Sequence, residues 1–459
     1  MELRDIQIPA VKAGVDFFKT KKTQPSIIVA PTAFGKSIVI AFIAKEINEK
    51  VLVIQPSKEL LKQNFEKFTN LGGEAEIYSS SFKSKKIGNV TYATIGSIVK
   101  VAHEFKTLGF TKVIIDECDR YPKKSDGMLR KFLTAAGMKW ILGLTATPLK
   151  LESEFDKISG DLYSKLAMLT TKTKNGSFFK DIIHVCQISE MIERKYWTPL
   201  KYESYDFDTG ELVYNSTGSE YTEKSILTAF TNQNILQKII KKVSSLTDRK
   251  SILISVPTID AALELEKRIP SCRAVYSGMD DGERDRVIND FKSLSLRVVA
   301  QVSILSVGFD HPELDCIITG RPTSSLSWWY QFVGRVTRIH PDKIDALVID
   351  FVGSVTKFGK IEDLVFKRDD TKWKLYGEDK KLLTDIPIPQ IGLYIEGQKT
   401  PLELAESIPN HILNFGKYAG RPIRSIPSSY RNWLIENYYW NKSNSHIKEA
   451  LINLQKLKI

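Results

Sequence analysis

A loop between residues 30 and 37 has the composition of a phosphate-binding site. Its letters, APTAFGKS, end in a glycine, a lysine and a hydroxyl, and they fit the relaxed pattern A/G-x-x-x-x-G-K-S/T. In such a loop, backbone N–H groups surround phosphate oxygens and the next helix presents its positive N-terminus. We expect Lys36 to neutralise phosphate charge and the Ser37 hydroxyl to ligate Mg2+. The other expected loop contacts are Pro31, Thr32, Ala33, Phe34 and Gly35.

Two letters of this loop depart from the common pattern. Ala30 replaces the first glycine, and Ala33 stands where related loops often have a second one. If the backbone at position 33 has a positive φ, an alanine is strained there. The alternative interpretation is an ordinary strand-to-helix turn that happens to contain the letters GKS.

A pair of carboxylates, Asp116 and Glu117, follows the β-branched run Val113 to Ile115. Such a run predicts a buried strand, and open α/β sheets place their chemistry at the carboxyl ends of strands. We expect Asp116 to hold Mg2+ and Glu117 to accept a proton from an attacking water. An acidic residue at a strand end is common in proteins. The pair therefore indicates a catalytic site only because it follows the phosphate-binding loop in the chain.

A third chemical pattern is QFVGRVTR, from Gln331 to Arg338. Arg335 and Arg338 are roughly one helical turn apart and so point the same way, and each offers a planar fork of donors for phosphate. With Gln331 they form a second candidate group of catalytic residues. Taken alone, the pattern is equally well explained as a basic helical face on the surface.

Strands and helices alternate around these residues. Apolar runs at residues 27–29, 51–54, 113–115 and 141–144 predict strands, with helices after residues 36 and 58. After a polar stretch from about 150 to 231, strand and helix patterns resume at residues 251–268, 281–292 and 298–319. This order predicts an α/β fold with parallel sheets.

Composition limits the class of protein. The 459 residues carry 42% hydrophobic side chains and a net charge of +12, which favours a soluble chain of several domains with a polyanionic partner. The cysteines (Cys118, Cys186, Cys272, Cys316) form no CxxC pair and the six histidines no ligand spacing, so we expect no zinc site. No leader or membrane-spanning run is visible, and we expect the cytoplasm, or the host cytoplasm if the chain is phage-encoded.

The motifs APTAFGKS, QPSKEL, DECD, LTATP, SVGFDHP and QxxGRxxR occur in the order found in superfamily 2 helicases, which the chain resembles over about 330 residues. The resemblance implies two tandem RecA-like domains, at residues 1–150 and 232–358, joined by a connecting segment at 151–231 and followed by an accessory domain at 359–459. It implies ATP and Mg2+ at the cleft between the domains. There Arg338 would act as an arginine finger beside Arg335, and Gly308 and Asp310 would contact the nucleotide, with Asp310 near the ribose.

Two residues upstream of the loop, Arg4 and Gln7, are further candidates for nucleotide binding. The two-sided amide of a glutamine can pair with the N6 and N7 edge of adenine. An ordinary surface glutamine is the alternative at this position.

The resemblance also implies contacts to the backbone of one nucleic-acid strand, without base specificity and with steep salt dependence. The expected contacts lie at strand ends: Pro56, Ser57, Lys58, Thr94, Ser97, Thr145, Thr147, Ser255 and Ser303. Small polar residues at strand ends also cap helices in many α/β proteins.

The last hundred residues contain the letters FGKYAGRPIRSIPSSYRNWL, which resemble a small module of phage and bacterial DNA-processing proteins. Basic side chains, among them Lys417, Arg421 and Arg424, alternate with aromatic ones, and this suits backbone tracking with base stacking. The alternative is that the aromatic residues are the core of a small domain.

The LTATP and GFDHP letters are most similar to those of compact phage helicases of the UvsW type, which remodel forks, and of restriction-enzyme motors. We therefore expect an ATP-dependent DNA helicase or translocase acting as a monomer on forked, branched or single-stranded DNA, without a membrane partner. Three alternatives remain: a double-strand translocase that does not unwind, an RNA helicase, and an ATP-gated DNA clamp without catalysis.

Overall fold

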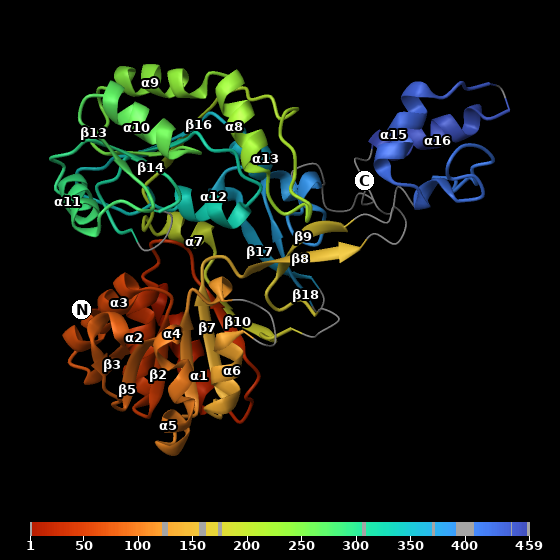
Figure 1. Ribbon diagram of the computed structural model, residues 1–459. Coiled ribbons are helices and arrows are strands. Elements are labelled where there is room, and N and C mark those ends of the chain that lie inside the picture. The colour runs from red at the N-terminus through yellow and green to blue at the C-terminus, as the bar shows by residue number, and fades with distance from the viewer. Residues whose placement is uncertain are drawn as a thin grey trace.

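The computed structural model describes residues 2–121, 127–155, 162–172, 177–304, 309–369, 372–391, 408–441 and 443–456. Two largely parallel sheets, each flanked by helices, form the first and second halves of the main body (Figure 1). The predicted α/β class with two RecA-like domains is confirmed.

The first sheet has eight strands in the order β10-β1-β7-β6-β2-β5-β3-β4, and its pairs are parallel except β3 with β4. Its central strands are buried on both faces, which explains their continuous β-branched runs. The strands are β1 (Ser26–Val29), β2 (Val51–Gln55), β3 (Ala75–Ser79), β4 (Ser84–Lys85), β5 (Val90–Thr94), β6 (Lys112–Asp116), β7 (Trp140–Thr145) and β10 (Asp181–Val185). The helices are α1 (Gln7–Lys19), α2 (Lys36–Ile47), α3 (Lys58–Asn70), α4 (Ile95–Ile98), α5 (Ala102–Thr107) and α6 (Met128–Ala135).

The second sheet has six parallel strands in the order β11-β16-β15-β12-β14-β13. They are β11 (Leu200–Ser204), β12 (Ile252–Ser255), β13 (Cys272–Val275), β14 (Val298–Gln301), β15 (Cys316–Thr319) and β16 (Ala346–Asp350). Its helices are α8 (Glu223–Asn232), α9 (Ile235–Ser245), α10 (Ile259–Arg268), α11 (Asp281–Lys292), α12 (Leu326–Val333) and α13 (Ser354–Phe358).

The segment 151–231, expected to be only a connection, adds an outer strand to each sheet. Strand β10 pairs in parallel with β1, and β11 pairs in parallel with β16. The same segment contains α7 (Ile188–Glu193) and most of an antiparallel hairpin of β8 (Leu149–Phe155) and β9 (Leu162–Met168). The first sheet therefore extends past residue 150, and the second begins before residue 232.

The described residues after 358 belong to two different bodies. Strands β17 (Val365–Asp369) and β18 (Lys372–Tyr376) form a hairpin whose Phe366 and Leu375 join the core of the main body. From residue 408, a small module with α15 (Ser428–Asn437) and α16 (Ser445–Lys456) has its own core and lies apart from the two sheets in Figure 1. Among the described residues, no helix is long and apolar enough to cross a membrane.

Candidate active site

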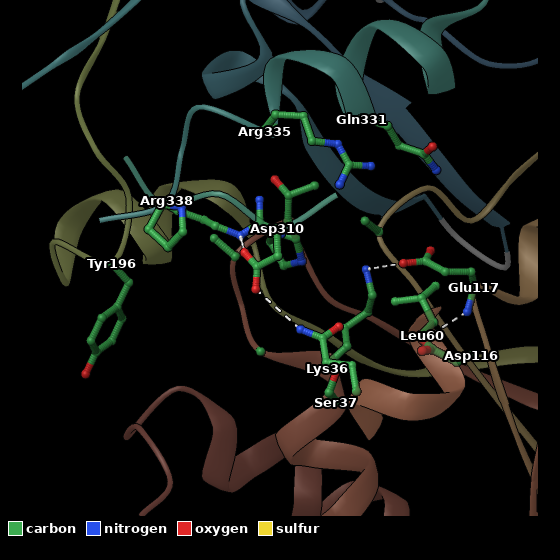
Figure 2. A pocket seen from close by; sticks show the side chains of 18 of the residues that line it. Lys36, Ser37, Leu60, Asp116, Glu117, Tyr196, Asp310, Gln331, Arg335 and Arg338 are labelled. Carbon is green, nitrogen blue, oxygen red and sulfur yellow. Dashed lines mark hydrogen bonds and ion pairs between the residues drawn. The ribbon is translucent and has the colours of Figure 1, made fainter. Parts of the chain in front are cut away.

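A pocket of about 310 Å3 lies where the carboxyl end of the first sheet meets the second half of the main body (Figure 2). Its walls come from both halves, and they contain most of the catalytic and phosphate-loop residues expected from the sequence. From the first half these are Pro31, Thr32, Ala33, Gly35, Lys36, Ser37, Asp116 and Glu117, and from the second half Asp310, Gln331, Arg335 and Arg338. The expected contact Gly308 lies outside the described residues.

The loop before α2 has the backbone of a phosphate cradle. Gly35 has φ 89° and Ala33 has φ 59°, so the alanine occupies the left-handed region that costs a side-chain-bearing residue about 1–2 kcal/mol. Phe34 is fully buried and anchors the loop. The N–H of Ile38 donates to the Gly35 carbonyl at 2.9 Å, whereas the N–H groups of Lys36 and Ser37 precede the first bond of the helix and are available to an anion.

Lys36 and Glu117 face each other in the pocket, with 3.0 Å between Nζ and Oε1. Burial alone would lower the pKa of Lys36, but the carboxylates of Glu117 and Asp116 outweigh it and raise that pKa. Oε2 of Glu117 is buried and accepts no hydrogen bond from any described residue. The pair holds a cation and an acceptor in the positions that phosphate neutralisation and water activation require.

Asp116 is fixed at the end of β6 by two hydrogen bonds. Asn64 Nδ2 donates to Oδ2 at 2.9 Å, and the backbone N–H of Glu117 donates to Oδ1 at 3.0 Å. Burial, with Glu117 as a second cause, raises the pKa of Asp116 to about 7. A buried carboxylate and the Ser37 hydroxyl line the same pocket, and such hard oxygen donors are the kind Mg2+ prefers, so the residues fit the cation expected from the sequence.

The second half contributes two arginines that are held in different ways. Nη1 of Arg335 donates to the Phe309 carbonyl at 2.8 Å, and burial, with Arg338 as a second cause, lowers the pKa of Arg335 to about 9. Arg338 forms an ion pair with Asp310. Gln63 of α3 also donates to Asp310, at 3.3 Å, so this carboxylate links the two halves of the main body.

The phosphate loop also touches the second half directly. The N–H of Thr32 donates to the Tyr330 hydroxyl at 3.3 Å, and Nε1 of Trp197 donates to the Thr32 carbonyl at 2.9 Å. Tyr330 belongs to α12, whose end leads into the two arginines. The geometry therefore presents a closed arrangement, in which residues about 300 positions apart form one site.

Gln7 takes a different role from the one expected. Its oxygen accepts from the Arg4 N–H at 2.8 Å, and its nitrogen donates to the Phe34 carbonyl at 2.5 Å. The side chain is 1% exposed, so it is neither an adenine-facing amide in this arrangement nor a surface glutamine. Arg4, by contrast, lines the pocket and donates to the Ala33 carbonyl at 3.1 Å.

The threonines of LTATP do not face a nucleic acid either. Thr145 and Thr147 are buried, and their hydroxyls donate to Asp119 at 2.5 and 3.1 Å. Burial, with Glu117 as a second cause, raises the pKa of Asp119 to about 6. These residues connect the end of β7 to the acidic group after β6, which corrects the expected backbone contact.

The other expected nucleic-acid contacts lie at the carboxyl ends of neighbouring strands. In the first sheet, Thr94 pairs in register with the last residue of β2, just before Pro56, and its hydroxyl bonds to that of Ser97 at 2.9 Å. Ser57 caps α3 and Lys58 is exposed. In the second sheet Ser303 is exposed, but Ser255 is 1% exposed and presents no hydroxyl to the surface in this arrangement.

In the C-terminal module, Lys417 and Arg421 are exposed and their cations lie over the ring of Tyr418. Arg424 is different, because its guanidinium donates to the backbone carbonyl of Ile408. It therefore holds the module together, which corrects its assignment to an exposed basic patch. The aromatic residues pack around the core, while Trp433 remains 50% exposed.

Several pocket residues were not predicted. Leu60, Gln63 and Lys67 share one face of α3 and line the pocket, and their i, i+3, i+7 spacing could have identified the face but not its target. Tyr196 lines the pocket from the connection after α7, and its ring lies 4.6 Å from the Arg4 guanidinium. No local signal in the sequence distinguishes this tyrosine from others.

Comparisons with known proteins agree with this geometry. Residues 1–150 match the family model "Type III restriction enzyme, res subunit", and residues 231–340 match "Helicase conserved C-terminal domain". IRC3 of Saccharomyces cerevisiae is 23% identical over 77% of this chain and 52% of its own length. The DNA 3'-5' translocase XPB2 of Sulfurisphaera tokodaii is 24% identical over 77% of this chain and 82% of its own length. The chain spans little more than half the length of the yeast relative.

Two solved structures share the fold. A type ISP restriction-modification enzyme, LlaBIII bound to DNA, superposes with a TM-score of 0.53 and 16% identity, covering 76% of this chain and 28% of that one. A fragment described as an HsdR subunit of a type I restriction enzyme from Vibrio vulnificus YJ016 superposes with a TM-score of 0.56 and 19% identity. The match covers 77% of this chain and 65% of that one. With the two sheets and the shared pocket, the two family matches make this chain a member of the superfamily 2 helicases.

Proposed function

We propose that this chain is an ATP-driven DNA motor whose hydrolysis site is the pocket between the two halves. The observation that carries the proposal is the convergence of Lys36, Glu117, Arg335 and Arg338 on one pocket from both halves. A nucleotide that contacts both walls of the pocket would stabilise the closed arrangement, and its release would remove that stabilisation. Nucleotide binding and the relative position of the two halves are therefore coupled.

Each residue has a defined task in this scheme. Lys36 and the N-terminus of α2 would bind the phosphates of ATP, while Ser37 and Asp116 would hold Mg2+, which supplies charge neutralisation when bound. Glu117 would orient a water and accept its proton through the carboxylate oxygen that has no hydrogen-bond donor among the described residues. Arg338 would exchange its ion pair with Asp310 for the terminal phosphate.

DNA is the proposed track. The net charge of +12 suits any polyanionic track, and the name of the Sulfurisphaera relative and the DNA-bound restriction enzyme support DNA over RNA. The strand ends that carry Ser57, Lys58, Thr94, Ser97 and Ser303 would hold the backbone of one strand, without reading bases. We also propose a monomer in the cytoplasm.

The finer proposal is that the motor remodels forked or branched DNA, in the manner of UvsW-type helicases. Its support is the separate C-terminal module, which offers the exposed Lys417 and Arg421 and the half-exposed Trp433 on a body outside the motor. Exposed cations with aromatic rings suit a nucleic-acid surface.

A substrate panel tests both levels of the proposal. Labelled forked, tailed, four-way and linear duplexes, and RNA counterparts, are incubated with ATP and Mg2+, and a triplex-displacement assay runs in parallel. We expect displacement on forks and four-way junctions and none with Glu117→Gln. Triplex displacement without strand separation would support a non-unwinding translocase. Activity confined to the RNA substrates would support an RNA helicase. ATP-dependent binding of DNA without ATP hydrolysis would support a clamp.

A further inference from the structure

A turn in the connecting segment, residues 213–222, contacts the second half directly before the helix that leads to the two arginines. The carboxylate of Glu220 accepts from the Ser324 N–H at 2.7 Å and from the Thr323 hydroxyl at 2.7 Å. The Ser324 hydroxyl donates to the Ser219 carbonyl, also at 2.7 Å. Thr323 and Ser324 are 5% and 1% exposed. Without Glu220, a buried N–H and a buried hydroxyl would therefore lose an acceptor.

These two contacts act on the start of α12. The Thr323 hydroxyl in turn accepts from the Ser325 N–H at 3.0 Å, and the Ser325 hydroxyl caps the helix by accepting from the Trp328 N–H at 3.2 Å. The helix has 8 residues, about two turns, and it is followed by Arg335 and Arg338. In so short a helix, a tilt at the capped end displaces the arginines that follow the other end.

The turn itself is fixed at two other points. Lys357 of α13 donates to the hydroxyls of Tyr214 and Tyr221 at 2.9 and 3.0 Å, and its ammonium lies over both rings. Elsewhere in the turn, the Thr217 carbonyl accepts from the Ser164 hydroxyl of β9. A carboxylate on a turn with these two anchors is held in one place, as a group that positions another element must be.

We propose that Glu220 is a positioning residue, which fixes the start of α12 so that Arg335 and Arg338 face the phosphates of the nucleotide. This rests on the proposed function and adds to it a residue of the connecting segment. Glu220 does not itself line the pocket, so it acts through α12. Misplacing a reacting group by about 1 Å costs about 100-fold in rate. Loss of the contact therefore lowers kcat, while Lys36 and the phosphate loop still bind the nucleotide.

The test measures DNA-stimulated ATP hydrolysis by variants of the full chain. Glu220→Ala lowers kcat by about 10- to 100-fold and changes KM for ATP by less than about 3-fold. Glu220→Gln, whose amide oxygen still accepts from the Ser324 N–H, restores kcat to within about 3-fold of the wild type. Thr323→Val removes one of the two contacts at nearly constant volume, and it lowers kcat by about 3-fold or more.

Glu223→Ala is the matched control. Glu223 lies three positions further along the same segment and pairs with Arg321 near the same loop, but its side chain is 74% exposed. Exposed ion pairs contribute little, so this variant keeps the wild-type kcat. An unchanged kcat in Glu220→Ala, or a fall that is matched by an equal rise in KM, overturns the inference.

Hydrogen exchange without nucleotide keeps this test separate from the motor proposal. Amides of the peptide that covers α12 should exchange about 10-fold faster in Glu220→Ala than in the wild type, and at the wild-type rate in Glu223→Ala. If the wild type hydrolyses no ATP but exchange changes in this way, the motor proposal fails and the hold of Glu220 on α12 stands. If exchange across α12 is the same in all three proteins, the inference is overturned, whatever the wild type hydrolyses.

Discussion

Gly334, directly after helix α12, lies against the side chain of Thr32 in the phosphate loop. A Cβ at position 334 would be 2.5 Å from Cγ2 and 2.6 Å from Oγ1 of Thr32, closer than non-bonded atoms approach. The glycine of QxxGRxxR is therefore required for the loop of one half to meet the arginines of the other.

This contact predicts the effect of Gly334→Ala. The added methyl group should keep the halves from closing, and DNA-stimulated ATP hydrolysis should fall by about 10- to 100-fold while ADP affinity stays within a few-fold. Gly282→Ala, at an exposed position of α11 where the new Cβ would approach only the Asp280 carboxylate, at 3.2 Å, is the control. Full hydrolysis by Gly334→Ala would show that the closed contact is not used in turnover.

The 3.0 Å pair of Lys36 and Glu117 predicts two different defects. Lys36→Ala removes phosphate charge and should weaken ATP binding, whereas Glu117→Gln keeps the shape of the site and should bind ATP yet stop turnover. Equilibrium titration and single-turnover hydrolysis distinguish the two. An equal loss of affinity in both variants would refute the assignment of roles.

Arg338 is paired with Asp310, and its proposed role requires it to leave that partner. Arg338→Ala should bind ATP almost normally but lose about 10³-fold in DNA-stimulated hydrolysis. DNA binding without nucleotide, measured by fluorescence anisotropy, should be retained. Near-normal turnover would mean that this arginine stays with Asp310 throughout the cycle.

His311 makes stability depend on pH. Its Nε2 lies 2.8 Å from the Ser251 hydroxyl, and burial lowers its pKa to about 4, although Glu313 lies 3.2 Å from Nδ1. The folded-state pKa is below the ordinary value of about 6.5, so this contribution to stability is complete above pH 6.5 and is lost as pH falls toward 4, by up to about 3 kcal/mol.

Urea unfolding of wild type and His311→Gln, followed between pH 7.5 and pH 4.5, checks this prediction. The stability difference between the two proteins should shrink as pH falls, because only the wild type loses the neutral imidazole. A difference that stays constant with pH would rule out His311 as the titrating group.

In the C-terminal module, the predicted surface is tested by removing only its exposed cations. Lys417→Ala with Arg421→Ala should weaken binding to forks more than to linear duplex. The slope of log binding constant against log salt concentration should become shallower by about 2, because two phosphate contacts are lost. Lys21→Ala with Lys22→Ala, an equal charge change at exposed positions after α1, is the control. Arg424 is left intact because it holds the Ile408 carbonyl. Unaltered fork binding would assign junction preference to the motor itself.

The local parts of this site could be predicted from the sequence. The loop before α2, the carboxylates after β6 and the two arginines after α12 each depend on short spacings that set their geometry. The roles of Gln7 and Thr145 could not be predicted, because their partners, Phe34 and Asp119, are 27 and 26 positions away. A residue's type shows what it can bond but not which group lies nearest in the fold.

The outer strands of the two sheets were harder still to predict. Strands β10 and β11 lie in a polar stretch, and only pairing with β1 and β16 makes them strands of the two sheets. Tyr196 enters the pocket because α7 ends just before it. Such positions depend on tertiary packing, which overrides local pattern.

The proposed function requires one pocket, formed by both halves, to couple ATP hydrolysis to DNA. Steady-state ATP hydrolysis by the full chain, with and without single-stranded and forked DNA, tests it most directly. We predict stimulation of about 10-fold or more by DNA, abolished by Glu117→Gln and by Arg338→Ala alike, since each half supplies one of these residues. Hydrolysis that no DNA stimulates, or that survives in Arg338→Ala, would contradict the account.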